Sequence, residues 1–141
     1  KKRLIHVFGS AGKRDAFKRP EMGQVSSEYA DIIILTSEDP RSESIDKINS
    51  EIIKGIKDQK FGIADYERIK NQESKIKENK KYIVQIPDRK EAIGFAISIA
   101  DKDDVVLLTG KGHERSINYG RGEQPWDENE IALSALRDRG K

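Results

Sequence analysis

Short apolar runs alternate with helix-like stretches along the 141-residue chain. Four of the runs are rich in β-branched residues and have the length of a strand. They occupy residues 4–8, 32–36, 82–86 and 104–109. The second run, Ile32-Ile33-Ile34-Leu35, has no polar alternation, which is typical of a strand covered on both faces.

Helical spacing of apolar residues predicts four helices between and after these runs. They cover residues 20–30, 45–56, 88–100 and 127–136. Pro20 suits the first turn of its helix, and Asp88 with Glu91 has the spacing of an N-cap with a capping box. Asp127 and Glu130 repeat that spacing ahead of the last helix.

Strands that alternate with helices predict an α/β fold, with a Rossmann-like, mostly parallel sheet and helices on both faces. Residues 57–81 are charged and carry few apolar positions, so we expect a loop and an exposed helix at the periphery. Residues 115–126 are expected to form a loop or a small hairpin.

Polar or glycine-rich loops follow three of the four predicted strands, at residues 9–20, 37–42 and 110–114. Ligands of parallel α/β sheets bind at the carboxyl ends of the strands. If the three strands are neighbours, the loops converge on one edge of the sheet.

Composition narrows the class of protein. Hydrophobic residues make up 35% of the chain and charged residues 37%, with a net charge of +2. No run approaches the roughly 20 apolar residues of a membrane span, so we expect a cytoplasmic protein without membrane contact. Without cysteine, and with two histidines that have no paired spacing, no metal site is expected.

The first loop, Gly9-Ser10-Ala11-Gly12-Lys13-Arg14-Asp15, is not a Walker A sequence, because its glycines, lysine and following residue lack that spacing. Its small residues let the backbone approach a ligand, and Arg14 offers a bidentate fork for a carboxylate or a phosphate. A structural glycine turn with a solvated arginine is the alternative.

The second loop places Glu38, Asp39, Pro40 and Arg41 in sequence. Two carboxylates and a guanidinium suit a zwitterion, while acidic residues before a helix are also ordinary caps that stabilise its N-terminus. Both interpretations remain open at this point.

The third loop, Gly110-Lys111-Gly112-His113-Glu114, frees the backbone with two glycines next to three polar side chains. His113 suits a general base because imidazole is the side chain that ordinarily titrates near neutral pH, yet no nucleophile is arranged with it, and a structural histidine is the alternative.

Taken together, four linked motifs resemble the C-terminal domain of the Mur ligase family, with the order and spacing of its UDP-N-acetylmuramoyl-tripeptide synthetases. The motifs are Val7-Phe8-Gly9 to Met22-Gly23, Thr36 to Glu43, Pro87-Asp88-Arg89-Lys90-Glu91-Ala92-Ile93, and Gly110-Lys111-Gly112-His113-Glu114. The resemblance spans residues 1–141 except a charged insertion at about 57–81.

The resemblance implies an ATP-dependent amide ligase of peptidoglycan synthesis, which adds the third amino acid to UDP-N-acetylmuramoyl-dipeptide through an acyl phosphate. In that family an N-terminal domain holds the UDP-sugar peptide, a central domain holds ATP and Mg²⁺, and the C-terminal domain binds the amino acid. The chain starts without Met, directly on a strand-like run, so we expect it to be this last domain alone, inactive by itself and monomeric.

By the resemblance, Arg14 holds a carboxylate of the incoming amino acid. Glu38, Asp39, Pro40 and Arg41 fall on the family's Asp-Asn-Pro-Arg motif, and Gly110 and Glu114 match residues at the distal end of meso-diaminopimelate. Lys111 and His113 are possible accessory residues, and no catalytic residue is expected in this domain. A distal carboxylate needs the fork of Arg41, which favours diaminopimelate over lysine.

This chain departs from the family motif by having Glu38-Asp39 in place of Asp-Asn. At residue 39 a carboxylate, which only accepts hydrogen bonds, thus replaces an amide, which also donates them. This difference leaves the identity of the substrate amino acid open.

Two other functions stay open. A stand-alone doubly wound module for nucleotides or nucleic acid would fit residues 1–19, which carry seven Lys or Arg and one Asp. A related Mur-type ligase with another acceptor, such as a folate or polyamino-acid ligase, is the second alternative. The four linked motifs favour the tripeptide synthetase over both, so nucleic acid is not the expected partner.

Overall fold

The computed structural model describes residues 2–13, 16–70 and 80–139 of the chain. Five parallel strands form one sheet in the order β3-β4-β2-β1-β5. The strands are β1 (Leu4–Phe8), β2 (Ile32–Leu35), β3 (Gly62–Ala64), β4 (Tyr82–Gln85) and β5 (Val105–Leu108). The predicted α/β fold with a parallel sheet is confirmed.

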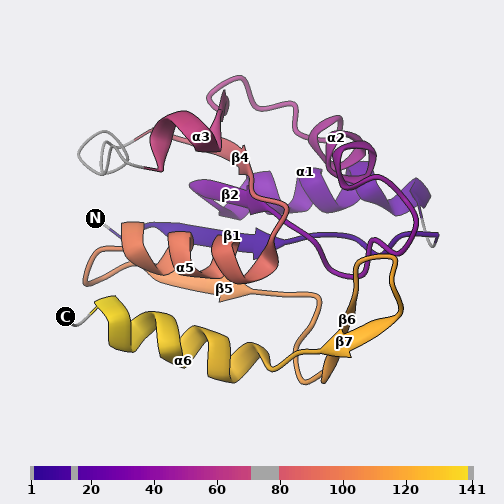
Figure 1. Ribbon diagram of the computed structural model, residues 1–141. Helices are drawn as coiled ribbons and strands as arrows, with labels where there is room; N and C mark the ends of the chain where they lie inside the picture. The colour runs from indigo at the N-terminus through magenta and orange to yellow at the C-terminus, as the bar shows by residue number, and fades with distance from the viewer. Residues whose placement is uncertain (1, 14–15, 71–79, 140–141) are drawn as a thin grey trace.

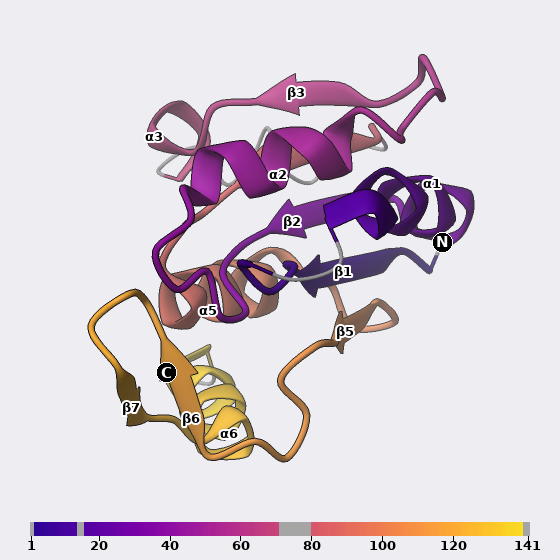
Figure 2. The ribbon, with the colours of Figure 1, turned by 90° about the vertical axis from the view of Figure 1, so that its right-hand side faces the viewer.

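Helices cover both faces of this sheet, as predicted (Figures 1 and 2). The helices are η1 (Ala16–Lys18), α1 (Arg19–Tyr29), α2 (Ile45–Ile53), α3 (Tyr66–Ile69), α5 (Arg89–Ile99) and α6 (Glu128–Arg139). On one face, Ile33 and Leu35 of β2 pack with Ile48 and Ile52 of α2. On the other face, the apolar side of α5 packs against the sheet, and Ile131 of α6 adds to that layer.

The predicted helix caps are present. Asp88 Oδ1 accepts a hydrogen bond from Glu91 N–H at 3.0 Å, and Asp127 Oδ1 accepts one from Glu130 N–H at 3.1 Å. Each carboxylate satisfies an N–H group that the first turn of a helix leaves free. These two caps fix where α5 and α6 begin.

The prediction for residues 57–81 is wrong in part. Residues 62–64 form the edge strand β3, which pairs with β4, and Tyr66 of α3 packs edge-to-face on Phe95 at 5.2 Å between ring centroids. An edge strand has only one ladder to satisfy, and Ile63 is 73% exposed, so no apolar pattern announces β3. Residues 71–79 of this segment, in which an exposed helix is predicted, lie outside the described residues.

The predicted small hairpin is confirmed. β6 (Ser116–Asn118) pairs antiparallel with β7 (Glu123–Pro125) as a separate two-stranded sheet. Figure 2 shows this hairpin beside the strand ends, next to the start of α6.

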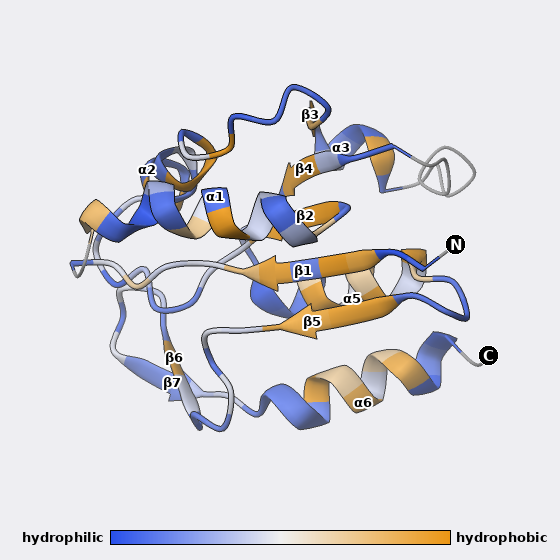
Figure 3. Cartoon of the chain, turned by 180° about the vertical axis from the view of Figure 1, so that it is seen from behind, coloured by the Kyte–Doolittle hydropathy of each residue, from blue (hydrophilic) through white to orange (hydrophobic). Residues whose placement is uncertain are grey.

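The sheet face beyond α1 is open over β1 and β5. Figure 3 looks onto this face and shows both strands coloured as hydrophobic. Val105 and Leu107 of β5 are 54% and 42% exposed, because β5 is an edge strand and no described helix packs on this side of it.

Candidate functional site

The three predicted loops meet at the carboxyl ends of β2, β1 and β5, which are neighbours in the sheet. Gly12 N–H donates to Asp39 O at 2.7 Å, and Arg41 Nη1 donates back to Gly12 O at 2.9 Å. Lys111 Nζ lies 2.8 Å from Asp39 Oδ1 and so joins the third loop to the second. The predicted convergence is therefore confirmed.

The β6–β7 hairpin is a fourth component of this edge. Asn118 N–H donates to Asp39 Oδ1 at 2.9 Å, and Arg41 N–H donates to Asn118 O at 3.0 Å. The sequence did not predict this contribution, because both contacts use the backbone of Asn118 and leave no side-chain signature.

Asp39 and Lys111 form a buried ion pair at the centre of the edge. Lys111 is 1% exposed and Asp39 is 8% exposed. Lys111 Nζ also donates to Glu114 Oε1 at 3.1 Å, so one ammonium serves two carboxylates. The charge of Asp39 is thus matched within the protein by Lys111.

Glu38 is half-buried and makes no hydrogen bond or ion pair with any described residue. Burial raises the pKa of its carboxyl, and the nearby negative charge of Glu114 raises it further, while Arg89 and Lys111 act in the opposite direction. A partly desolvated carboxylate without a partner is costly to keep charged, so the position of Glu38 is chemically suited to a cation.

Gly110 allows Glu38 to occupy its position. A Cβ atom at residue 110 would lie 2.4 Å from Glu38 Oε1, and the φ angle of +103° is one that residues with side chains rarely adopt. The Glu38 carboxylate thus lies directly against the backbone of Gly110, at the start of the Gly110–Glu114 loop.

Arg41 has a φ of 55°, in the left-handed region, which turns the chain sharply after Pro40. Non-glycine residues in this conformation concentrate at functional sites. One nitrogen of its guanidinium is bonded to Gly12 O, and Arg41 forms no ion pair among the described residues. Its remaining N–H groups are available to a ligand carboxylate.

Arg14 lies outside the described residues, so the predicted contact of its side chain is not seen. The preceding residue, Lys13, has a φ of 61° and donates its N–H to Glu43 Oε1 at 2.8 Å. Glu43 in turn holds the buried guanidinium of Arg19 at 2.7 Å. The backbone N–H groups of Gly12 and Lys13 are therefore both used within the protein.

His113 is exposed and makes no hydrogen bond to any described residue. The described residues therefore support neither interpretation of His113, because they offer it neither a nucleophile to activate nor a hydrogen bond to hold its ring. Lys111, treated from the sequence as an accessory ligand residue, is instead a buried counter-ion of Asp39.

The sequence also missed Arg89, which is fully buried. Its guanidinium binds the Glu128 carboxylate through Nε at 2.9 Å and Nη2 at 2.6 Å. The same group donates to Ser37 O at 2.9 Å and to Thr109 O at 3.0 Å.

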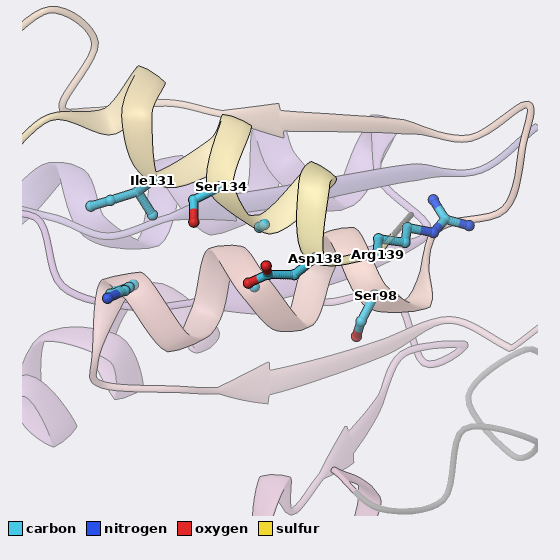
Figure 4. A pocket seen from close by; sticks show the side chains of 8 residues that line it. Ser98, Ile131, Ser134, Asp138 and Arg139 are labelled. Atoms are coloured by element: carbon cyan, nitrogen blue, oxygen red, sulfur yellow. The ribbon is translucent and has the colours of Figure 1, made fainter. Parts of the chain in front are cut away.

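Two hollows lie apart from the site residues that the sequence predicts. One, of about 590 Å³, runs between α5 and α6 (Figure 4). It is lined by Lys90, Gly94, Ser98, Ile131, Ser134, Ala135, Asp138 and Arg139. The other, of about 740 Å³, lies on the open sheet face between α1 and β5. Neither hollow is lined by a site residue that the sequence predicts.

No group of three or more His, Cys, Asp or Glu side chains within residues 2–13, 16–70 and 80–139 is placed to hold a metal ion. In the same ranges, no helix has the length and apolar character needed to span a bilayer.

Known proteins resemble this chain over most of its length. A 2,6-diaminopimelate ligase of Caldanaerobacter subterraneus, named "UDP-N-acetylmuramoyl-L-alanyl-D-glutamate--2,6-diaminopimelate ligase", is 44% identical over 139 residues, which are 99% of this chain and 25% of that protein. A protein of Borreliella afzelii, named "UDP-N-acetylmuramyl-tripeptide synthetase", is 43% identical over 134 residues, which are 95% of this chain and 23% of that protein.

A solved structure of a protein with the same name as the first relative superposes on the whole chain with a TM-score of 0.78 and 29% identity, and the match covers 25% of that structure. The chain thus spans about a quarter of the length of these relatives. The sequence model of the family described as "Mur ligase, glutamate ligase domain" matches residues 1–112, which include all three loops at the strand ends up to Gly112. The chain therefore belongs to the Mur ligase family.

Proposed function

We propose that this chain is the amino-acid-binding domain of an ATP-dependent amide ligase, which adds meso-diaminopimelate to UDP-N-acetylmuramoyl-dipeptide in peptidoglycan synthesis. The names of two relatives that match 95% or more of the chain state diaminopimelate ligation. In the proposed reaction the amine of the amino acid forms the amide bond with an activated carboxyl group, and phosphate leaves.

The observation that carries the proposal is the Glu38 carboxylate, which is half-buried, has no partner among the described residues, and lies beside Glu114. The distal end of diaminopimelate is a zwitterion with an ammonium and a carboxylate. In the proposed complex, Glu38 and Glu114 receive the ammonium and Arg41 receives the carboxylate in a bidentate contact. Arg14 holds a second carboxylate of the same molecule.

Asp39 bears on the choice of amino acid. Its carboxylate is paired with Lys111 and accepts the Asn118 N–H group, so its charge is largely balanced inside the protein. The acidic residue in place of the family's amide therefore does not by itself favour a more cationic amino acid. Arg41 has no such carboxylate partner among the described residues, and a lysine substrate would leave its fork without a carboxylate.

ATP and Mg²⁺ enter the proposed reaction from elsewhere in a longer enzyme. The first loop does not fit a phosphate cradle, because the N–H groups of Gly12 and Lys13 already donate to Asp39 O and Glu43. The same occupied N–H groups argue against a stand-alone nucleotide-binding module. No step of phosphate transfer is assigned to the described residues.

The test uses the full-length enzyme that contains this chain. Arg41→Ala is expected to raise the KM for meso-diaminopimelate by about 100-fold or more, since a lost charge-assisted contact is worth roughly 1.5–3 kcal/mol and the fork makes two. The KM for ATP should stay within about twofold. Arg137→Ala is the matched control, because Arg137 is exposed on α6 and pairs only at 3.6 Å with Glu130.

Equal effects of Arg41→Ala on both KM values would contradict the proposal. A wild-type enzyme that ligates lysine as well as meso-diaminopimelate would contradict the choice of amino acid while leaving the amide ligase in place.

A further inference from the structure

Arg89 connects two strand ends that the sheet itself does not connect. Its guanidinium donates to Ser37 O, at the end of β2, and to Thr109 O, at the end of β5. In the sheet order β1 lies between β2 and β5, so no ladder hydrogen bond joins these two ends. The guanidinium of Arg89 therefore bridges the ends of β2 and β5, next to the candidate site.

The two carbonyl groups are those of the residues immediately before the site. Ser37 precedes Glu38, and Thr109 precedes Gly110. The Glu38 carboxylate lies where a side chain at residue 110 would be, so the end of the Glu38 side chain and the backbone of Gly110 are close neighbours. The spacing of Glu38 and Glu114 therefore depends on what holds Ser37 and Thr109.

Arg89 itself is fixed in place. Four of its five N–H donors are used: Nε and one Nη2 donor on Glu128, one Nη1 donor on Ser37 O, and the second Nη2 donor on Thr109 O. Glu128 is 6% exposed and also accepts the Trp126 Nε1–H group at 3.0 Å. The Arg89 backbone N–H donates to the Tyr119 hydroxyl at 3.1 Å. Tyr119 lies between β6 and β7, so this bond attaches the hairpin to the start of α5.

We infer that Arg89 is a positioning residue of the proposed amino-acid site, whose planar fork sets the separation of Glu38 from the Gly110–Glu114 loop. This inference rests on the proposed function, because it assigns to Glu38 and Glu114 a common ligand group, the distal ammonium. Arg89 does not contact that group. It acts through the backbone carbonyls of the residues that precede Glu38 and Gly110.

The substitution Arg89→Lys tests the geometry of the side chain apart from its charge, because it keeps a positive charge and removes the planar guanidinium. An ammonium keeps the positive charge beside Glu128, but its three donors radiate from one atom and cannot span two carbonyls and a carboxylate as a planar fork does. In the full-length enzyme, Arg89→Lys is expected to raise the KM for meso-diaminopimelate about tenfold or more, in keeping with the sensitivity of bound geometry to small displacements. The KM values for ATP and for the UDP-sugar peptide should stay within about twofold.

Arg3 provides the matched control at the opposite edge of the sheet. It is also buried, at 5% exposure, binds Asp104 through Nε at 3.0 Å and Nη2 at 2.8 Å, and donates to the backbone carbonyl of Ile99. Arg3→Lys removes a similar fork before β1, far from the carboxyl ends of the strands. It should lower the melting temperature by a comparable amount without changing the KM for meso-diaminopimelate.

A second variant covers the case in which Arg89→Lys does not fold. The double substitution Arg89→Met with Glu128→Met removes both buried charges together, so no unpaired charge is left in the interior. It is expected to fold and to show the same selective rise in KM.

The outcomes separate the two proposals. If the wild-type enzyme does not use meso-diaminopimelate, the proposed function is overturned and this inference with it. If the wild-type enzyme uses it and the folded Arg89 variants keep the wild-type KM, or change all three KM values alike, only the positioning role of Arg89 is overturned.

Discussion

The ammonium of Lys111 lies 2.8 Å from Oδ1 of Asp39, and both side chains are buried although 72 residues separate them in sequence. The pair joins the loop after β5 to the loop after β2. It therefore holds the two loops together and also balances the charge of Asp39. Breaking a buried ion pair from one side leaves a charge without its partner, which is more costly than never having the pair.

Asp39→Asn tests this pair. The amide oxygen can still accept from Lys111 and Asn118, and Glu114 remains near the ammonium, so we expect a loss of about 1–2 kcal/mol in the free energy of unfolding. Urea denaturation of the chain at neutral pH measures it. Asp103→Asn is the control, because Asp103 is exposed, and an equal loss in both variants would show that the pair contributes nothing special.

Gly110→Ala tests the shared space of Glu38 and residue 110. The φ angle of +103° is unfavourable for alanine, so we expect a loss of about 1–3 kcal/mol in stability, and the new methyl group would displace the flexible Glu38 carboxylate. In the full-length enzyme the displaced Glu38 should also raise the KM for meso-diaminopimelate.

Gly112→Ala is the matched comparison for that variant. Gly112 also has a positive φ, of +53°, but no atom lies within 4 Å of the position of a Cβ atom there. It should lose only about 1 kcal/mol from backbone strain. If both alanine variants raise the KM equally, the contact with Glu38 is not the reason.

His6 gives the protein a stability that depends on pH. Its ring contacts Ser26 Oγ and Thr109 Oγ1, each at 2.8 Å, and stacks on Phe8. Burial lowers the pKa of His6 from 6.5 to about 4, so between these values the unfolded chain binds a proton that the folded chain does not. Stability should therefore fall as the pH drops from 6.5 towards 4, by at most about 2 kcal/mol after allowance for partial exposure.

Urea midpoints measured from pH 7 to pH 4 check this dependence. His6→Gln keeps the polar contacts and should remove that part of the slope. A wild-type slope that survives His6→Gln would assign the dependence to other groups.

Glu43 is expected to matter more than Glu51, although both bind Arg19. Glu43 accepts from two nitrogens of Arg19 and from Lys13 N–H, whereas Glu51 accepts from one nitrogen of Arg19. Glu43→Gln should therefore cost about 2–3 kcal/mol of unfolding free energy and Glu51→Gln about 1 kcal/mol. Equal losses would contradict the central role of Glu43 in holding the first loop.

The hydrogen bonds from Arg19 and Lys13 hold the pKa of Glu43 well below its usual range. For a carboxyl with a lowered pKa in the folded state, the stabilisation is present above the ordinary value near 4.5 and is lost as the pH falls below it. Acid unfolding of Glu43→Gln should accordingly show a shallower dependence on pH below 4.5 than that of the wild-type chain.

The sequence predicted the four main strands, the helix caps and the meeting of three loops, because each leaves a local pattern or follows from parallel strands. It did not predict β3, whose three residues carry one exposed isoleucine. The bridging role of Arg89 was not predicted either. Two of its partners are the backbone carbonyls of Ser37 and Thr109, and every residue has such a carbonyl whatever its side chain. The ligand roles proposed for Arg41 and Glu114 rest on the resemblance, since no periodicity in the sequence indicates them.

The long separation of Asp39 from its partners also has a kinetic side. Asp39 receives Lys111 from 72 residues away and Asn118 N–H from 79 residues away, whereas the caps of α5 and α6 close within three residues. Contacts at such separations carry more loop-closure entropy than local ones and are expected to form later in folding. In refolding followed by hydrogen exchange, the amide of Asn118 should become protected after those of Glu91 and Glu130, so the edge that holds the candidate site should form after the first turns of α5 and α6.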